Sequence, residues 1–170
     1  MIAREPERKR SFMNEKAADE SGFASWLVCR AGTHLCAMAL QHVAEVMRML
    51  PIEPLAGAPH YVRGLCIIRG APTPVVDTGS LMGDRATRPE RLVAVKAGGR
   101  GVALAVEAVV GVRAIRAGAS DQMPPLLRDA ATETVAAIGI LDAELLFFLR
   151  TARIVPEELL SRLDALETVT

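Results

Sequence analysis

Residues 64–77, GLCIIRGAPTPVVD, contain the pattern that decides the fold. An unbroken apolar run over residues 65–68 predicts a buried strand, and TPVVD predicts a second, with Gly70 to Pro72 as the connection. Arg69 follows the first run directly. A guanidinium is expensive to bury without partners, so Arg69 lies either where the strand emerges into water or where another molecule supplies acceptors.

Upstream of this stretch, the sequence predicts a hairpin followed by a helix. Residues 26–40, WLVCRAGTHLCAMAL, are two apolar runs around Gly32-Thr33, and glycine in the first of two turn positions suits a type II′ hairpin. That register places Cys29 opposite Cys36. Residues 41–50, QHVAEVMRML, carry apolar residues at helical spacing and are followed by proline, so we predict a helix of about two turns there.

Downstream, short β-branched runs alternate with turn residues, a pattern typical of a small barrel. The runs are RLVAVKA, GVALAVEAVV and GVRAIRA, separated by Gly98-Gly99 and Gly111, and residues 136–149 repeat the hairpin pattern with Asp142 to Glu144 at the turn. PEELLSRLDALE then predicts a C-terminal helix, since proline and two glutamates favour a helix N-terminus. The prediction is all-β with small helices.

Composition and charge argue against several functional classes. Twenty basic residues balance twenty acidic ones, which argues against a nucleic-acid binder that neutralises many phosphates. The longest apolar runs are far shorter than the roughly 20 residues that span a bilayer, so we expect no membrane insertion. Residues 1–23 are charged and lack the apolar core of a signal peptide, which predicts a mobile tail and a cytoplasmic protein.

Residues with catalytic or metal-binding chemistry are few. A zinc site would collect Cys29, His34, Cys36 and His42, but their spacing matches no standard ligand pair and strand alternation separates the side chains. Thiols acting as small core hydrophobes are the favoured interpretation. The sequence shows no nucleophile with a base and no phosphate loop. We therefore predict no enzyme, metal or cofactor, and a small thiol or metal enzyme is the least favoured alternative.

Residues 58–83, APHYVRGLCIIRGAPTPVVDTGSLMG, resemble the signature segment of the CheW family of bacterial chemotaxis adaptors. The family pattern is a proline, an aromatic, a glycine that opens a strand, Arg-Gly, and then a proline and an apolar pair before an aspartate. The residues that match it are Pro59, Tyr61, Gly64, Arg69, Gly70, Pro74, Val75, Val76 and Asp77. HVAEVM upstream matches the family's helix, and the resemblance covers about residues 24–155.

The resemblance implies an architecture of two tandem five-stranded SH3-like barrels around a joint core, with short helices and a C-terminal helix. The implied boundaries are a mobile tail over 1–23, a single CheW-like domain over 24–155 and the C-terminal helix over 156–170. Within the domain, subdomain 1 is expected over about 24–83 plus the closing strand near 145–155, and subdomain 2 over about 84–144.

The resemblance also implies a non-catalytic adaptor in chemotaxis-type signal transduction. Its partners would be the regulatory domain of a CheA-type histidine kinase and the cytoplasmic tip of methyl-accepting chemoreceptors, with recruitment to membrane-associated receptor arrays. The alternative is the same module in a non-flagellar pathway, type IV pilus motility or second-messenger control. Ile67, Glu107 and Arg150 depart from the family pattern, which leaves the pathway open.

The family motif implies two groups of functional positions. Receptor binding is expected at Arg69, Gly70, Glu45 and Val43, and a structural role at Gly64, Pro74, Asp77 and Tyr61. Two interpretations of Arg69 stay open: it braces the strand junction through Asp77 or loop carbonyls, or it faces the receptor tip. Glu45 is expected to be solvated, paired with Arg48 or in contact with a partner, and Val43 is favoured as a core residue.

Overall fold

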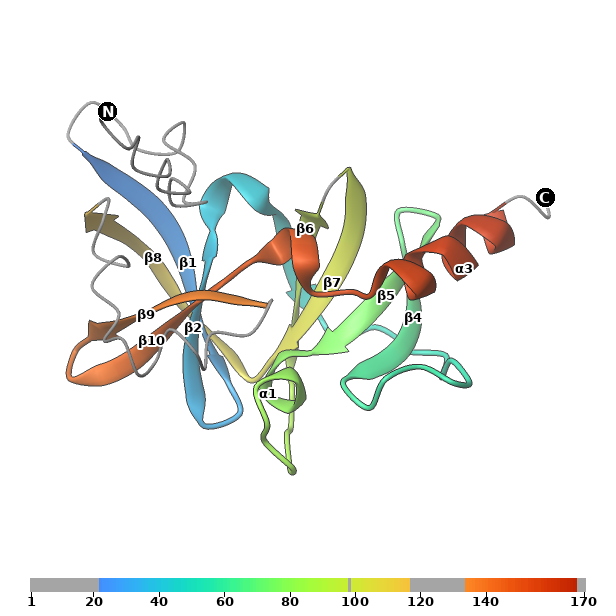
Figure 1. Ribbon diagram of the computed structural model, residues 1–170, viewed down its shortest axis with the longest axis horizontal. Coiled ribbons are helices and arrows are strands. Elements are labelled where there is room, and N and C mark those ends of the chain that lie inside the picture. Colours follow the sequence, from blue (N-terminus) through green and yellow to red (C-terminus); the bar gives the residue numbers. More distant parts are fainter. Residues whose placement is uncertain (1–21, 98, 117–133, 168–170) are drawn as a thin grey trace, which may run out of the picture.

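The computed structural model describes residues 22–97, 99–116 and 134–167, and these form two five-stranded sheets (Figure 1). The first sheet has the order β8-β1-β2-β10-β9 and comprises β1 (Phe23–Ala31), β2 (His34–Ala39), β8 (Ala108–Arg116), β9 (Val135–Leu141) and β10 (Glu144–Leu149). The second has the order β3-β6-β7-β5-β4 and comprises β3 (Val43–Arg48), β4 (Val62–Ile68), β5 (Ala71–Asp77), β6 (Arg91–Ala97) and β7 (Arg100–Val106). The predicted all-β fold is confirmed.

The helices of the described residues are short and lie between or after the strands. They are η2 (Leu40–His42), α1 (Thr78–Leu81), η3 (Thr151–Arg153) and α3 (Glu157–Glu167). The predicted C-terminal helix is therefore present as α3, and Leu159 and Leu163 on it are buried. Its outer end is held by Arg100, whose guanidinium hydrogen bonds to both carboxylate oxygens of Asp164.

Both sheets have the same strand topology, and each half of the chain contributes to both of them. The hairpin β1–β2 belongs to the first sheet, while β3, β4 and β5 cross into the second. In the second half, β6–β7 belongs to the second sheet, while β8, β9 and β10 cross back. Each sheet contains one parallel pair, β2 with β10 and β5 with β7, and this pair joins strands from the two halves. Neither half of the chain completes a sheet alone, so the two sheets form one folding unit.

This exchange divides the chain differently from the subdomains we expected. The second sheet takes its strands from residues 43–106, not from a segment beginning near residue 84. The first sheet combines residues 23–39 with residues 108–149, so β8 and β9 join it as well as the closing strand β10.

The buried apolar side chains form three clusters, one of which is shared by the two sheets. Alternate residues of a strand point to opposite faces, so Leu27 enters a core shared by the two sheets while Trp26 enters a cluster on the other face. The Trp26 and Phe148 rings pack edge-to-face with centroids 4.9 Å apart. The second sheet has an equivalent private cluster around Leu92, and the shared core also receives Leu159 of α3.

The helix predicted over residues 41–50 is wrong. Only the single turn η2 is helical, and Val43–Arg48 form the edge strand β3, antiparallel to β6. Over six residues, the same valines fit either a helical stripe or strand alternation, and β-branched residues favour strands. Pairing with β6, from Val95 to Arg91, decides the outcome, because it satisfies backbone groups along one side of β3.

The turns confirm some predictions and shift others. Gly32 has φ 57° and the strands pair in the predicted register, with Cys29 opposite Cys36. The connection between β4 and β5 is Arg69-Gly70, which begins one residue and ends two residues earlier than predicted, because β5 begins at Ala71. Gly111 does not end a strand: β8 runs through it.

Candidate partner-binding site

Arg69 occupies the first position of the two-residue turn between β4 and β5. Its φ is 50° and that of Gly70 is 79°, so both central residues are left-handed, as in a type I′ hairpin turn. Glycine, asparagine and aspartate usually fill such positions, whereas an arginine with positive φ is uncommon. The hairpin therefore holds an unfavourable residue at its tip, and this is a local conformation that is often retained for function.

The Arg69 guanidinium forms a two-pronged ion pair with Glu45. Arg69 Nε donates to Glu45 Oε1 at 3.0 Å and an Nη of Arg69 donates to Glu45 Oε2 at 3.2 Å. The pairing lowers the pKa of Glu45 and raises that of Arg69, so both groups stay charged at neutral pH. Among the described residues, the Arg69 side chain forms no hydrogen bond with Asp77 or with a loop carbonyl, and Glu45 pairs with Arg69 rather than with Arg48.

This ion pair joins the two edges of the second sheet. Glu45 lies on β3 and Arg69 follows β4, and these are the first and last strands in the order of that sheet. The side chain of Arg69 is 81% exposed and that of Glu45 32% exposed, so the pair adds little to stability. Its main effect is to fix where a charged, solvent-facing guanidinium lies.

The neighbourhood of Arg69 contains an apolar side chain that the sequence-based interpretation did not assign to the site. Ile67 is 62% exposed on edge strand β4, two residues before Arg69. A Cβ added at Gly70 would meet no atom within 4 Å, so space does not require glycine there. Its positive φ does. Val43, in contrast, packs against the shared core and is only half-exposed. Arg69, Gly70 and Glu45 thus come together on one surface, whereas Val43 contributes packing.

The expected structural residues lie around the base of the same hairpin. Gly64 has φ 139°, and a Cβ placed there would lie 1.9 Å from the carbonyl oxygen of Glu53, whose segment pairs with Leu65. Pro74 is buried immediately before the parallel ladder with β7 begins at Val75, where its missing N–H costs no bond to β7.

Asp77 is the polar centre of this structural group. Its backbone N–H donates to the Tyr61 carbonyl at 2.7 Å, and its Oδ1 caps α1 by accepting from the Ser80 amide at 3.1 Å. The other oxygen accepts from Thr87 and Arg63. Because Asp77 is buried and has several donors, it organises the strand end rather than meeting solvent.

Two further carboxylates, Asp84 and Glu107, bind the β1–β2 turn through hydrogen bonds that the sequence did not predict. Glu107 accepts from the amides of Gly32 and Arg88, while Asp84 accepts from the Thr33 amide at 2.9 Å. Asp84 also accepts from the Thr33 hydroxyl at 3.0 Å and lies 3.1 Å from His34 Nδ1. Both carboxylates lie in loops, with no sequence pattern that connects them to Gly32-Thr33.

We predict that the Asp84 contact makes stability depend on acid pH. Burial raises the pKa of Asp84, but its hydrogen bonds from Thr33 and His34 outweigh this and hold the pKa below its usual value. A carboxyl with a lowered folded-state pKa stabilises the protein above its unfolded-state pKa, and the gain is lost as pH falls through the folded value. Asp84→Ala should cost about 2 kcal/mol at pH 7 and progressively less below about pH 4. Thermal denaturation across pH measures this.

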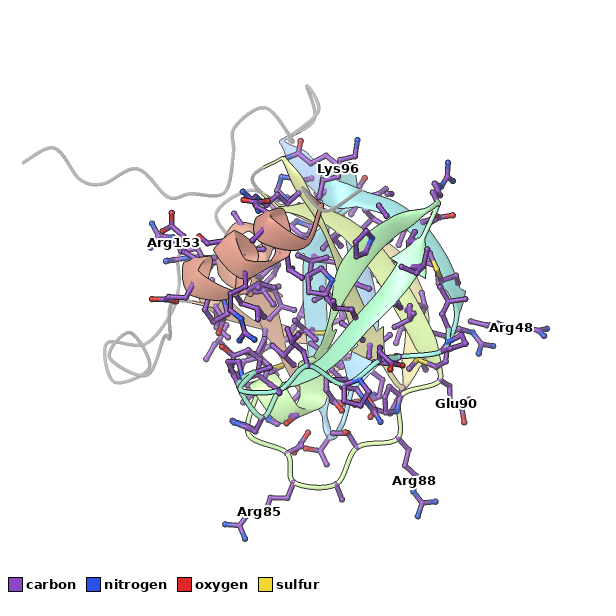
Figure 2. The ribbon with its side chains drawn as sticks, turned by 90° about the vertical axis from the view of Figure 1, so that its right-hand side faces the viewer. Arg48, Arg85, Arg88, Glu90, Lys96 and Arg153 are labelled. Atoms are coloured by element: carbon purple, nitrogen blue, oxygen red, sulfur yellow. The ribbon has the colours of Figure 1, made fainter. Side chains whose placement is uncertain are left out.

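Glu90→Ala is the matched control, since Glu90 is an exposed acid in the same loop (Figure 2). It should leave the melting temperature unchanged. A constant difference between Asp84→Ala and wild type from pH 7 to about pH 2 would contradict the assigned role of the charge.

The four residues of the zinc alternative are not brought together. Cys29 and Cys36 lie in the shared core, His34 contacts Asp84, and His42 Nδ1 lies 2.9 Å from the Thr151 hydroxyl. Burial raises the pKa of the Cys29 thiol to about 12. Within the described ranges, no cluster of three or more histidine, cysteine or acidic side chains has metal-binding geometry.

None of the helices in the described ranges is both long enough and apolar enough to cross a bilayer.

Comparison with known proteins identifies the family. A family model described as the CheW-like domain matches residues 25–159. The chain belongs to the CheW-like domain family. CheW proteins are non-catalytic scaffolds and adaptors of chemotaxis signalling, and the predicted resemblance is confirmed.

A solved structure supports the same fold. This CheW-like chain is similar to the crystal structure of the scaffolding protein TtCheW from Thermoanaerobacter tengcongensis, with a TM-score of 0.65 and 21% sequence identity. The match covers 76% of this chain and 90% of that one. At this identity the likeness concerns the fold alone. No curated protein sequence matches the chain.

Proposed function

We propose that this CheW-like protein couples chemoreceptors to a CheA-type histidine kinase. The observation that carries the proposal is the Glu45–Arg69 pair, which holds an exposed guanidinium at the tip of a strained hairpin. Exposed Ile67 beside it adds apolar surface of the kind that partners bury. This surface is the proposed contact for the cytoplasmic tip of the receptor.

In this proposal the protein performs no covalent step. It binds the receptor tip through the surface around Arg69 and the regulatory domain of the kinase through another surface, so receptor movement alters kinase activity through fixed geometry. Interfaces of this kind are modest, and many linked copies strengthen one another in a membrane-associated receptor array.

Calorimetric titration against the regulatory domain of each CheA-type kinase from the same genome tests the kinase half of the proposal. We expect saturable binding to one of them, with a Kd of about micromolar or below, and no change for Arg69→Glu. The kinase that binds identifies the pathway, flagellar or of another kind such as type IV pilus motility or second-messenger control. A folded protein that binds none of them would refute the coupling role.

A further inference from the structure

A second charged surface lies away from the Glu45–Arg69 pair. It is formed by four arginines, Arg48 at the end of β3, Arg91 at the start of β6, and Arg85 and Arg88 in the loop between α1 and β6, here called the arginine ridge. All four residues are exposed. Figure 2 shows Arg48, Arg85 and Arg88 projecting from the body of the protein into solvent.

The acidic residues of this region do not neutralise the ridge. Asp84 is engaged by Thr33 and His34, and Glu107 by two backbone amides, so both point into the fold. Glu90, in the same loop, is exposed and forms no side-chain ion pair with any residue that the structure describes. Of the ion pairs between described residues, none includes a ridge arginine. The chain as a whole has a formal net charge of zero, so this excess of positive charge is local.

Two of the ridge arginines oppose each other across the sheet. Arg48 on β3 and Arg91 on β6 are partners in the antiparallel register, so their Cβ atoms face the same side of the sheet. Like charges directly opposite are destabilising. The fold therefore carries an unfavourable pair of positive charges at an exposed strand end. An anionic partner bound there would relieve the repulsion.

We propose that the arginine ridge binds an acidic segment of a protein partner. Arginine presents a planar fork that matches carboxylates, and all the cations of the ridge are arginine. An anionic membrane suits the ridge less well, because four cations are the lower limit of the about four to eight in a polybasic lipid-binding cluster, and Glu90 lies among them. A discrete partner can place its carboxylates around Glu90, whereas a lipid surface cannot avoid it.

The ridge is distinct from the surface around Arg69. Glu45 and Arg48 are three positions apart on β3, so their side chains leave opposite faces of the strand. Binding at the ridge therefore goes beyond the proposed receptor contact and can succeed or fail independently of it.

Fluorescence anisotropy with a labelled decaglutamate peptide tests the proposal. The test variant is Arg48→Glu with Arg88→Glu, which leaves Arg91 opposite a carboxylate and so relieves the cross-strand repulsion. The matched control is Lys96→Glu with Arg153→Glu, which makes the same change in net charge at two exposed positions away from the ridge (Figure 2). Melting temperatures verify that each variant is folded.

We expect wild type and control to bind the peptide with affinities within about twofold of each other, and the ridge variant to bind at least about tenfold more weakly. Binding should weaken from about 50 to about 300 mM salt, because the Debye length shortens. Equal loss in both variants, or no binding by wild type, would overturn the proposal. Ridge-dependent binding to vesicles of phosphatidylserine and phosphatidylcholine, without peptide binding, would also overturn it and identify a membrane instead.

Discussion

Gly64→Ala should destabilise the protein by about 3 kcal/mol or more, the largest effect we expect from any single methyl group in this fold. Two costs combine at this position. The φ of 139° is one that only glycine adopts readily, and the added Cβ would lie 1.9 Å from the Glu53 carbonyl oxygen. That oxygen belongs to backbone held by paired hydrogen bonds between Glu53 and Leu65, both 2.8 Å, so it cannot yield as a flexible side chain would.

Two other glycines separate these costs. Gly83 has φ 99° with open space around it, so Gly83→Ala should show backbone strain alone, about 1 kcal/mol. Gly101 has neither a restrictive φ nor a close neighbour, and Gly101→Ala should be nearly neutral. Urea denaturation of the three variants gives the ranking. Equal losses for Gly64→Ala and Gly83→Ala would show that the approach of Glu53 is not tight.

Arg69→Glu should weaken binding to a chemoreceptor cytoplasmic fragment by about tenfold or more, since a central exposed arginine would be replaced by its opposite charge. Glu45→Arg should have a similar effect, because it removes the partner that positions the guanidinium and places like charges together. Pull-down or calorimetry with the receptor fragment measures both.

The double variant, Glu45→Arg with Arg69→Glu, distinguishes the two roles that the sequence left open for Arg69. It can restore an ion pair between β3 and the β4–β5 turn while reversing the charge presented to a partner. If Arg69 contacts the receptor itself, the double variant stays defective. Recovered receptor binding would mean that the pair only braces the hairpin. Binding to the kinase domain serves as the control and should be unchanged in all three variants.

The sequence predicted those features that depend on neighbouring residues. Alternating apolar runs and the Gly32-Thr33 hairpin with Cys29 opposite Cys36 follow from local rules. The two strands on either side of Arg69-Gly70 were also predicted, with their turn displaced by one or two residues. These predictions succeeded because local conformation and burial pattern agreed over the same short segments.

Features that depend on distant pairing could not be predicted in the same way. Residues 43–48 carry a pattern compatible with helix or strand, and only the presence of β6 decides between them. The exchange of strands between the sheets, and with it the meeting of Glu45 and Arg69, is a property of topology. The same holds for Glu107 and Asp84, whose respective partners Gly32 and Thr33 lie more than fifty residues away in the chain.

The coupling role is tested most directly by the autophosphorylation rate of the cognate CheA-type kinase in the presence of the receptor fragment. Our account predicts that the receptor changes this rate when the wild-type protein is present, and that the change is lost without the protein or with Arg69→Glu, although that variant still binds the kinase. A receptor effect on the kinase that is the same with and without this protein would contradict the account.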